Sequence, residues 1–145
     1  MPGEARSAAA LSLAYMVAIA GKVLRSFPLD VLDLLLVAAI ADANAARSAM
    51  PSPRKTRAAR AVPPADKTGI SRNAVSRMLG VPLETVRRRV AALVERKILI
   101  EQADGLVFNP DNPITLGSNA ELNAFNMEML TRLFRGLKAN GIKLD

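Results

Sequence analysis

The residues best suited to chemistry are three consecutive arginines, Arg87 to Arg89, preceded by Glu84 and Thr85. A guanidinium group can donate two hydrogen bonds to a guanine edge, and a carboxylate can accept one from the amino group of a cytosine. On a helix, these side chains would point away from the buried stripe described below. The candidates for reading bases in the major groove are therefore Glu84, Thr85, Arg87 and Arg88.

Most catalytic chemistry is excluded by composition. The chain contains neither histidine nor cysteine, which excludes imidazole acid–base catalysis, thiol nucleophiles and thiolate metal sites. We also find no paired carboxylates, glycine-rich phosphate loop or metal-ligand spacing. The sequence therefore predicts a protein that is not an enzyme and that holds no cofactor and no metal.

The arginines lie on a helix predicted over residues 82–96. Its apolar residues Val86, Val90 and Leu93 recur at the spacing of one helix face. Pro82 suits the first turn, where its missing N–H leaves no hydrogen bond unmade. This helix is the predicted recognition helix.

A shorter helix is predicted over residues 71–79, with Val75, Met78 and Leu79 directed inward and Gly80 ending it. Its polar and basic side chains suit contacts to phosphates, which orient a protein on DNA without reading sequence. The phosphate-contact candidates here and on the recognition helix are Ser71, Arg72, Asn73, Ser76, Arg77 and Arg89.

Two short apolar runs, at 97–101 and 106–109, flank Asp104 and Gly105, a pair that suits a tight hairpin turn. Helix, glycine turn, helix and hairpin follow one another as in a winged helix–turn–helix, whose second helix enters the major groove. Asp104 stands at the wing tip, where a side chain that reads the minor groove is often basic. A strong contact from this wing is not expected.

The net charge of +7 is concentrated in the middle of the chain. By our count, residues 47–70 and 71–100 each carry +5, while both ends are slightly acidic. Residues 48–68 contain four prolines and predict either a flexible linker, which we favour, or a basic arm along a phosphate backbone. The arm would add Arg54, Lys55, Arg57 and Arg60 to the phosphate contacts.

Three further helices are predicted outside the basic middle. The first covers residues 4–25, the second covers 29–46, and the third begins at Ser118, which has the spacing of a capping box with Glu121. Their apolar residues recur at helical spacing. These residues are Leu13, Met16 or Val17, Ala20 and Leu24 in the first helix, Val31, Leu34, Leu35, Ala38 and Ala39 in the second, and Leu122, Phe125, Met129, Leu133 and Leu137 in the third, widened by Leu130 and Phe134.

The apolar run over residues 8–20 could be an export signal or a membrane segment. The preceding residues carry both Glu4 and Arg6 rather than the positive bias of a signal. The run is also shorter than the roughly twenty residues that span a bilayer, and a basic face for lying on a membrane is missing. We therefore predict a mature helix in a cytoplasmic protein with no membrane contact.

The stretch from Ala74 to Ile100 resembles bacterial winged-helix transcription regulators. The resemblance is carried by the turn Leu79-Gly80-Val81, the pair Thr85-Val86 six residues after Leu79, and the exit Leu93-Val94-x-x-Lys97-x-Leu99 into the wing. Length and helix order are similar to MarR-type regulators, while the run Thr85-Val86-Arg87 is shared with GntR-type domains. The MarR-like resemblance implies double-stranded DNA as partner, a homodimer formed by the first and last helices, and a pocket for an unidentified small-molecule effector.

The predicted fold is mainly α with a small β-hairpin wing, a winged helix–turn–helix with N- and C-terminal dimerisation helices. The predicted regions are an N-terminal dimerisation helix at 1–28, the DNA-binding region at 29–109 with its insertion at 48–68, and a connector with the C-terminal helix at 110–145. Tyr15, Met16, Phe125 and Met129 could line an effector pocket, although such residues more often belong to a core. The alternative function is a winged-helix module that binds protein or RNA without an operator.

Overall fold

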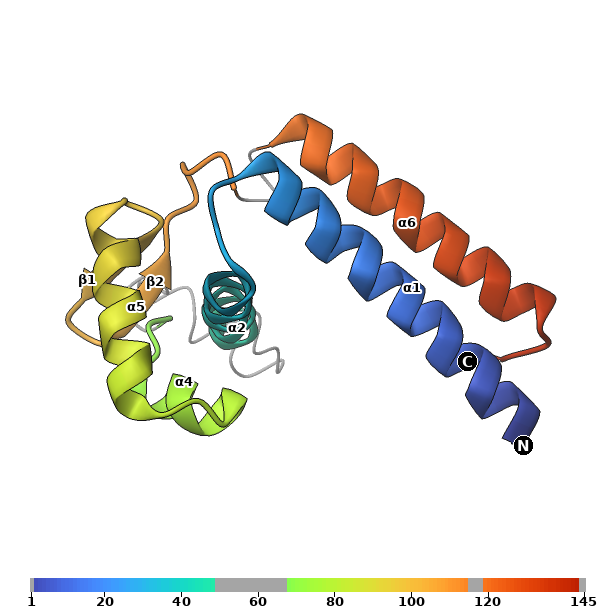
Figure 1. Ribbon diagram of the computed structural model, residues 1–145, viewed down its shortest axis with the longest axis horizontal. Coiled ribbons are helices and arrows are strands. Elements are labelled where there is room, and N and C mark those ends of the chain that lie inside the picture. The colour runs from blue at the N-terminus through green and yellow to red at the C-terminus, as the bar shows by residue number, and fades with distance from the viewer. Residues whose placement is uncertain (1, 49–67, 115–118, 144–145) are drawn as a thin grey trace, which may run out of the picture. The chain divides into compact units, whose positions relative to one another are not determined.

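The computed structural model of the chain describes residues 2–48, 68–114 and 119–143 (Figure 1). It is mainly helical and contains a small two-stranded antiparallel hairpin. The chain divides into two compact units. Unit 1 combines residues 1–31 with 113–145, and unit 2 consists of residues 32–112.

Unit 1 is a pair of antiparallel helices, α1 (Pro2–Ser26) and α6 (Ala120–Ala139) (Figure 1). The helices approach closely because Gly136 has no side chain, and a Cβ atom there would lie 2.6 Å from Cδ2 of Leu11. As the sequence predicts, Leu122, Met129 and Leu137 on the apolar face of α6 are buried, whereas Phe134, which was expected to widen that face, is 54% exposed.

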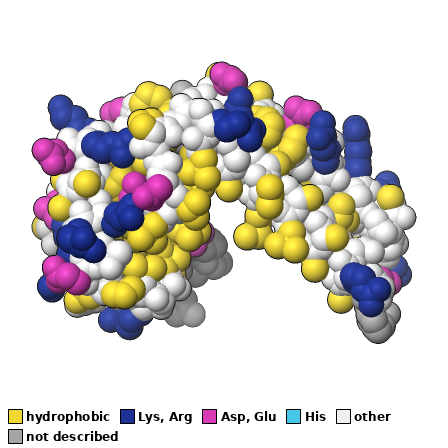
Figure 2. All heavy atoms as spheres, in the orientation of Figure 1, with side chains coloured by type: hydrophobic (Ala, Val, Ile, Leu, Met, Phe, Trp, Pro, Cys, Tyr) yellow, Lys and Arg dark blue, Asp and Glu magenta, His cyan; other side chains and the backbone are white. Residues whose placement is uncertain are grey.

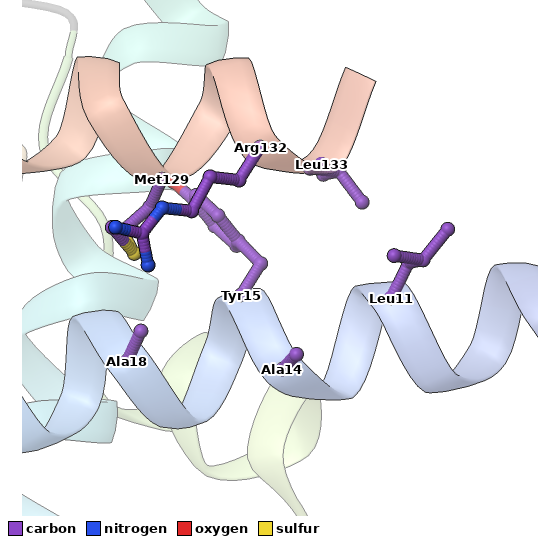
Figure 3. A pocket seen from close by; sticks show the side chains of 7 residues that line it. All are labelled: Leu11, Ala14, Tyr15, Ala18, Met129, Arg132 and Leu133. Carbon is purple, nitrogen blue, oxygen red and sulfur yellow. The ribbon is translucent and has the colours of Figure 1, made fainter. Parts of the chain in front are cut away.

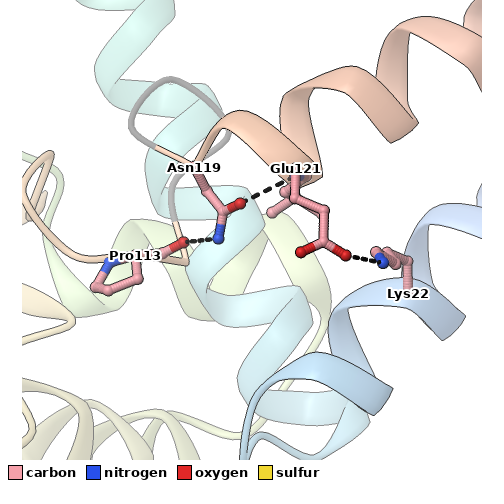
Figure 4. A network of polar contacts seen from close by, with 5 residues as sticks. Lys22, Pro113, Asn119 and Glu121 are labelled. Atoms are coloured by element: carbon pink, nitrogen blue, oxygen red, sulfur yellow. Dashed lines mark hydrogen bonds and ion pairs between the residues drawn. The ribbon is translucent and has the colours of Figure 1, made fainter.

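The start of α6 differs from the prediction by one residue. Asn119 is the N-cap, because its side chain accepts a hydrogen bond from the N–H of Leu122 at 2.9 Å and donates one to the carbonyl of Pro113 at 2.7 Å (Figure 4). Asparagine and serine are nearly equal as caps, so the spacing could not distinguish them. Ser118, the expected cap, lies outside the described residues.

Glu121 joins the two helices of unit 1. Its carboxylate accepts a hydrogen bond of 2.8 Å from Nζ of Lys22 on α1 (Figure 4). This hydrogen bond and the positive charge of Lys22 lower the pKa of the Glu121 carboxyl below its ordinary value of 4.5. The ammonium group of Lys22 also lies 5.6 Å from the centre of the Phe125 ring.

The predicted stripe of α1 lies on the helix face that points away from α6. Leu13, Met16 and Val17 are exposed, Val17 to 70%, whereas Leu11 and Tyr15 on the opposite face are only half-exposed. Hydrophobic side chains accordingly gather on the surface along α1 (Figure 2). This face is apolar and has no partner within the described part of unit 1.

The length of α1 corrects one step of the sequence argument. The helix extends well beyond the apolar run at 8–20, and its part Gly3–Ser26 is strongly apolar and almost entirely unburied. By length and composition alone it could cross a membrane, and it is the one such helix in the described ranges. The shortness of the run at 8–20 therefore does not by itself exclude a membrane segment.

Unit 2 contains α2 (Val31–Ser48), α4 (Arg72–Leu79), α5 (Leu83–Glu95), β1 (Leu99–Gln102) and β2 (Gly105–Phe108). The two strands form the predicted hairpin, with Leu99 opposite Phe108 and Gln102 opposite Gly105. Ile70 adds a single antiparallel bridge to Leu106 on the outer side of β2. The largest fully buried side chains of the unit are Leu36, Ile40, Val75, Val86, Val90, Leu93, Leu99 and Leu106.

Two predictions of inward-facing residues in unit 2 were wrong in part. On α2 the buried face contains Leu36 and Ile40, whereas Val31 and Leu35 are exposed. Apolar residues occupy almost the whole circumference of this helix, so their periodicity could not select the buried face. On α4, Val75 is buried as expected but Met78 is 50% exposed.

Candidate nucleic-acid interface

The turn between α4 and α5 is built on backbone hydrogen bonds and one serine. Gly80 adopts the left-handed conformation with φ of 67°, and the N–H groups of Gly80 and Val81 both donate to the carbonyl of Ser76, at 2.9 and 3.2 Å. The hydroxyl of Ser76 donates in turn to the carbonyl of Val81 at 2.6 Å. Ser76, a phosphate-contact candidate, is therefore engaged in holding this turn. Ser71 is the N-cap of α4 and accepts from the N–H of Ala74 at 3.1 Å.

The recognition helix α5 is anchored as its sequence predicts. Val86, Val90 and Leu93 are buried, while Pro82 is the N-cap residue directly before the helix. The base-reading candidates Glu84, Arg87 and Arg88 are exposed on the outer face, and Thr85 is half-buried beside them. Acidic and basic side chains lie close together on the surface of unit 2 (Figure 2).

The turn from α5 into the wing depends on a lysine whose backbone is in the left-handed conformation. Lys97 has φ of 62°. Its N–H donates to the carbonyl of Val94, and the N–H of Ile98 donates to the carbonyl of Leu93, each at 3.0 Å. These two hydrogen bonds form a Schellman motif, in which glycine normally occupies the left-handed position. The carbonyl of Lys97 accepts from the Asn109 amide at 2.8 Å, which ties the hairpin to the end of the recognition helix.

Asn44 on α2 holds the wing from the other side. Its amide nitrogen donates to the carbonyls of Thr68 and Leu106 at 2.6 and 3.1 Å, and its carbonyl oxygen accepts from the N–H of Phe108 at 2.8 Å. Sequence reasoning missed this residue because its partners lie 24, 62 and 64 residues away. The available signal was one polar residue among the alanines near the end of this helix.

The acidic wing tip has a structural role. The carboxylate of Asp104 accepts a hydrogen bond of 2.8 Å from the N–H of Gly69. The next residue, Gly105, has φ of 132°, and a Cβ atom there would lie 2.6 Å from the carbonyl oxygen of Ile70. Asp104 and Gly105 therefore fasten the wing tip to the segment before α4.

Three predicted DNA-contacting arginines are paired with carboxylates of unit 2. Arg87 lies 3.6 Å from Glu84, one turn earlier in α5. The other two pairs are Arg72 with Glu101 of β1 and Arg89 with Asp33 of α2, the latter at 3.3 Å. Among the remaining candidates, Asn73, Arg77 and Arg88 are exposed, whereas Arg54, Lys55, Arg57 and Arg60 lie outside the described residues.

No protein-family model, curated protein or solved structure matches this chain. The resemblance to winged-helix regulators therefore rests on the residues quoted above. What the structure adds is a mainly helical chain with a two-stranded hairpin, which is compatible with a winged helix.

Unit 1 contains a small apolar cavity between α1 and α6, with a volume of about 170 Å³ (Figure 3). It is lined by Leu11, Ala14, Tyr15, Ala18, Met129, Arg132 and Leu133. Of the four residues considered for an effector pocket, Tyr15 and Met129 line this cavity, whereas Met16 and Phe125 do not. The hydroxyl of Tyr15 donates to the side-chain carbonyl of Asn126. Within the described ranges, no group of three or more acidic side chains is placed to hold a metal ion.

Proposed function

We propose that this chain is a cytoplasmic, homodimeric transcription regulator that binds specific sequences of double-stranded DNA. The observation that supports the proposal is the division of α5 into two faces. One face buries Val86, Val90 and Leu93, and the other exposes Glu84, Arg87 and Arg88. A helix anchored along one face and charged along the other fits the major groove of B-form DNA.

The proposed contacts divide into two groups. Arg88 and Arg87 read guanine by paired hydrogen bonds, and Glu84 accepts from a cytosine amino group. Exposed Ala91 and Ala92 in the following turn have side chains small enough for the helix to approach the bases. The phosphate contacts that orient the helix come from α4, for which exposed Arg77 is the best-placed cation.

A second copy of the chain is the proposed partner of the exposed face of α1. The face contains Leu13, Met16 and Val17, all more than half exposed, and such a patch marks an interaction surface more often than free surface. A two-fold dimer would present two recognition helices to a pair of DNA half-sites.

The proposal is tested by fluorescence anisotropy of the full chain with a random-sequence duplex over a salt series. We expect submicromolar binding near 50 mM salt that weakens steeply as salt rises. The double variant Arg87→Ala/Arg88→Ala should bind at least roughly tenfold more weakly, because each arginine supplies both charge and hydrogen bonds.

The matched control is Arg132→Ala/Arg135→Ala on α6, which removes the same charge from unit 1 and should bind almost as well as the wild type. A folded, monodisperse wild-type protein that fails to bind duplex at low salt would contradict the proposal. That outcome would favour a winged-helix module for protein or RNA.

A further inference from the structure

Two of the candidate arginines of unit 2 are paired with carboxylates that also face solvent. In α5, the Glu84 and Arg87 side chains are 76% and 56% exposed. Between α4 and β1, Arg72 pairs with Glu101, and their side chains are 33% and 53% exposed. Arg77 and Arg88, by contrast, have no carboxylate partner within the described residues.

The pair of Arg89 with Asp33 is of a different kind. The Asp33 side chain is only 15% exposed, and the contact joins α5 to α2. We therefore regard Arg89 as a positioning residue for the recognition helix. Its loss would disturb the orientation of α5 as well as any phosphate contact.

When DNA binds, its phosphates can replace the exposed carboxylates as partners of the two arginines. A carboxylate and a phosphate make the same charge-assisted hydrogen bonds to a guanidinium group, and solvent-exposed ion pairs are weakly held. After the exchange, the displaced carboxylate stays close to the incoming phosphate and repels it. This repulsion is present on every duplex, whatever its sequence.

We propose that Glu84 and Glu101 are intramolecular counterions that restrain sequence-independent binding of DNA, and that Glu84 thereby determines specificity. The inference rests on the proposed function. At a matching site, Glu84 accepts a hydrogen bond from a cytosine amino group, and this contact offsets the repulsion. Glu101 lies on the wing strand β1 rather than on the recognition helix, and it lowers the affinity for all duplexes alike.

The test compares the full-length wild type with Glu84→Gln and Glu101→Gln on two probes. One probe is a random-sequence duplex, and the other is a duplex selected with the wild-type protein from a random library. Glu95→Gln is the matched control, because Glu95 is also an exposed acidic residue of α5 but has no ion-pair partner within the described residues.

We expect Glu84→Gln to raise the affinity for the random duplex about threefold to tenfold near 50 mM salt, with a smaller gain at about 200 mM. The increase in the affinity of Glu84→Gln for the selected duplex should be smaller, because a neutral amide accepts a weaker hydrogen bond from cytosine. Glu101→Gln should strengthen binding to both probes by the same factor, and Glu95→Gln should change either affinity less than about twofold.

Two results would overturn the inference while leaving the proposed function intact. One is a random-duplex affinity of Glu84→Gln no higher than that of Glu95→Gln. The other is an equal gain of Glu84→Gln on both probes, which would remove its role in specificity. A wild type that binds neither probe at low salt would overturn the proposed function, and this inference with it.

Discussion

At the scale of single residues, Lys97 differs most clearly from the backbone conformation that a residue with a Cβ atom favours. It holds a left-handed conformation that an L-residue with a Cβ atom adopts at a cost of about 1 kcal/mol or more. The Schellman hydrogen bonds and the Asn109 amide keep it there. The strain is local and should be removable without changing the fold.

We predict that Lys97→Gly is more stable than Lys97→Ala by about 1 kcal/mol, since glycine adopts positive φ without steric cost. Both variants lose the same charge, so the comparison isolates the backbone conformation. Urea unfolding at neutral pH measures the difference. Equal stability of the two variants would show that the left-handed conformation at this position is not strained.

Gly80, which acts through its neighbours in sequence, could be predicted, and residues that act across the fold could not. Gly80 was placed correctly, because a glycine after a helical stripe signals a left-handed end. Asn44 and Asp104 bind backbone groups that are distant in sequence. Their hydrogen bonds become visible only when the wing and α2 are in place.

At the scale of elements, α1 and α6 are fastened by few polar contacts, of which Lys22 with Glu121 has a predictable response to pH. The pKa of Glu121 is lowered in the folded state, so its contribution to stability is present above the unfolded value of about 4.5. The contribution is lost as the pH falls through the folded pKa. Acid should therefore loosen this contact.

We predict that Glu121→Gln is less stable than the wild type at neutral pH, and that the difference narrows below about pH 4.5 and vanishes once the wild-type carboxyl is protonated. Thermal unfolding of both proteins between neutral pH and about pH 2.5 measures this. In a Lys22→Met background, Glu121→Gln should have little effect on the pH dependence. Parallel curves for the wild type and Glu121→Gln would contradict the assignment.

Element types could be predicted more readily than the faces that the elements bury. The recognition helix and the hairpin follow from clear periodicity and an Asp-Gly turn. For α2, the apolar residues surround the helix, so the buried face is decided by packing against the other elements of unit 2. For α1, the apolar stripe could be recognised in the sequence. The sequence did not show that α6 packs against the opposite face of the helix and leaves this stripe exposed.

At the scale of the whole molecule, the surface proposed for assembly is the apolar face of α1, which has no partner within the described part of unit 1. Val17 lies near its centre and is 70% exposed. If a second copy covers this face, burying a charge there carries a large desolvation cost. If nothing covers it, the same charge is harmless.

We predict that Val17→Lys shifts the protein from dimer to monomer by at least roughly tenfold in the dissociation constant. The matched control is Ala124→Lys, which adds the same charge to the exposed surface of α6, between Glu121 and Glu128 in sequence. Sedimentation velocity over a concentration series distinguishes the two variants. A wild type that stays monomeric at tens of micromolar would contradict the proposed dimer.

The two helices of unit 1 come from opposite ends of the chain, and this order has a consequence for synthesis on the ribosome. Helix α1 ends at Ser26 and α6 begins at Ala120, so the second helix is translated on the order of ten seconds after the first. During that interval the nascent α1 displays apolar residues on both faces, including the one that α6 later covers. The protein is therefore most vulnerable to chaperone capture and aggregation before α6 has left the ribosome.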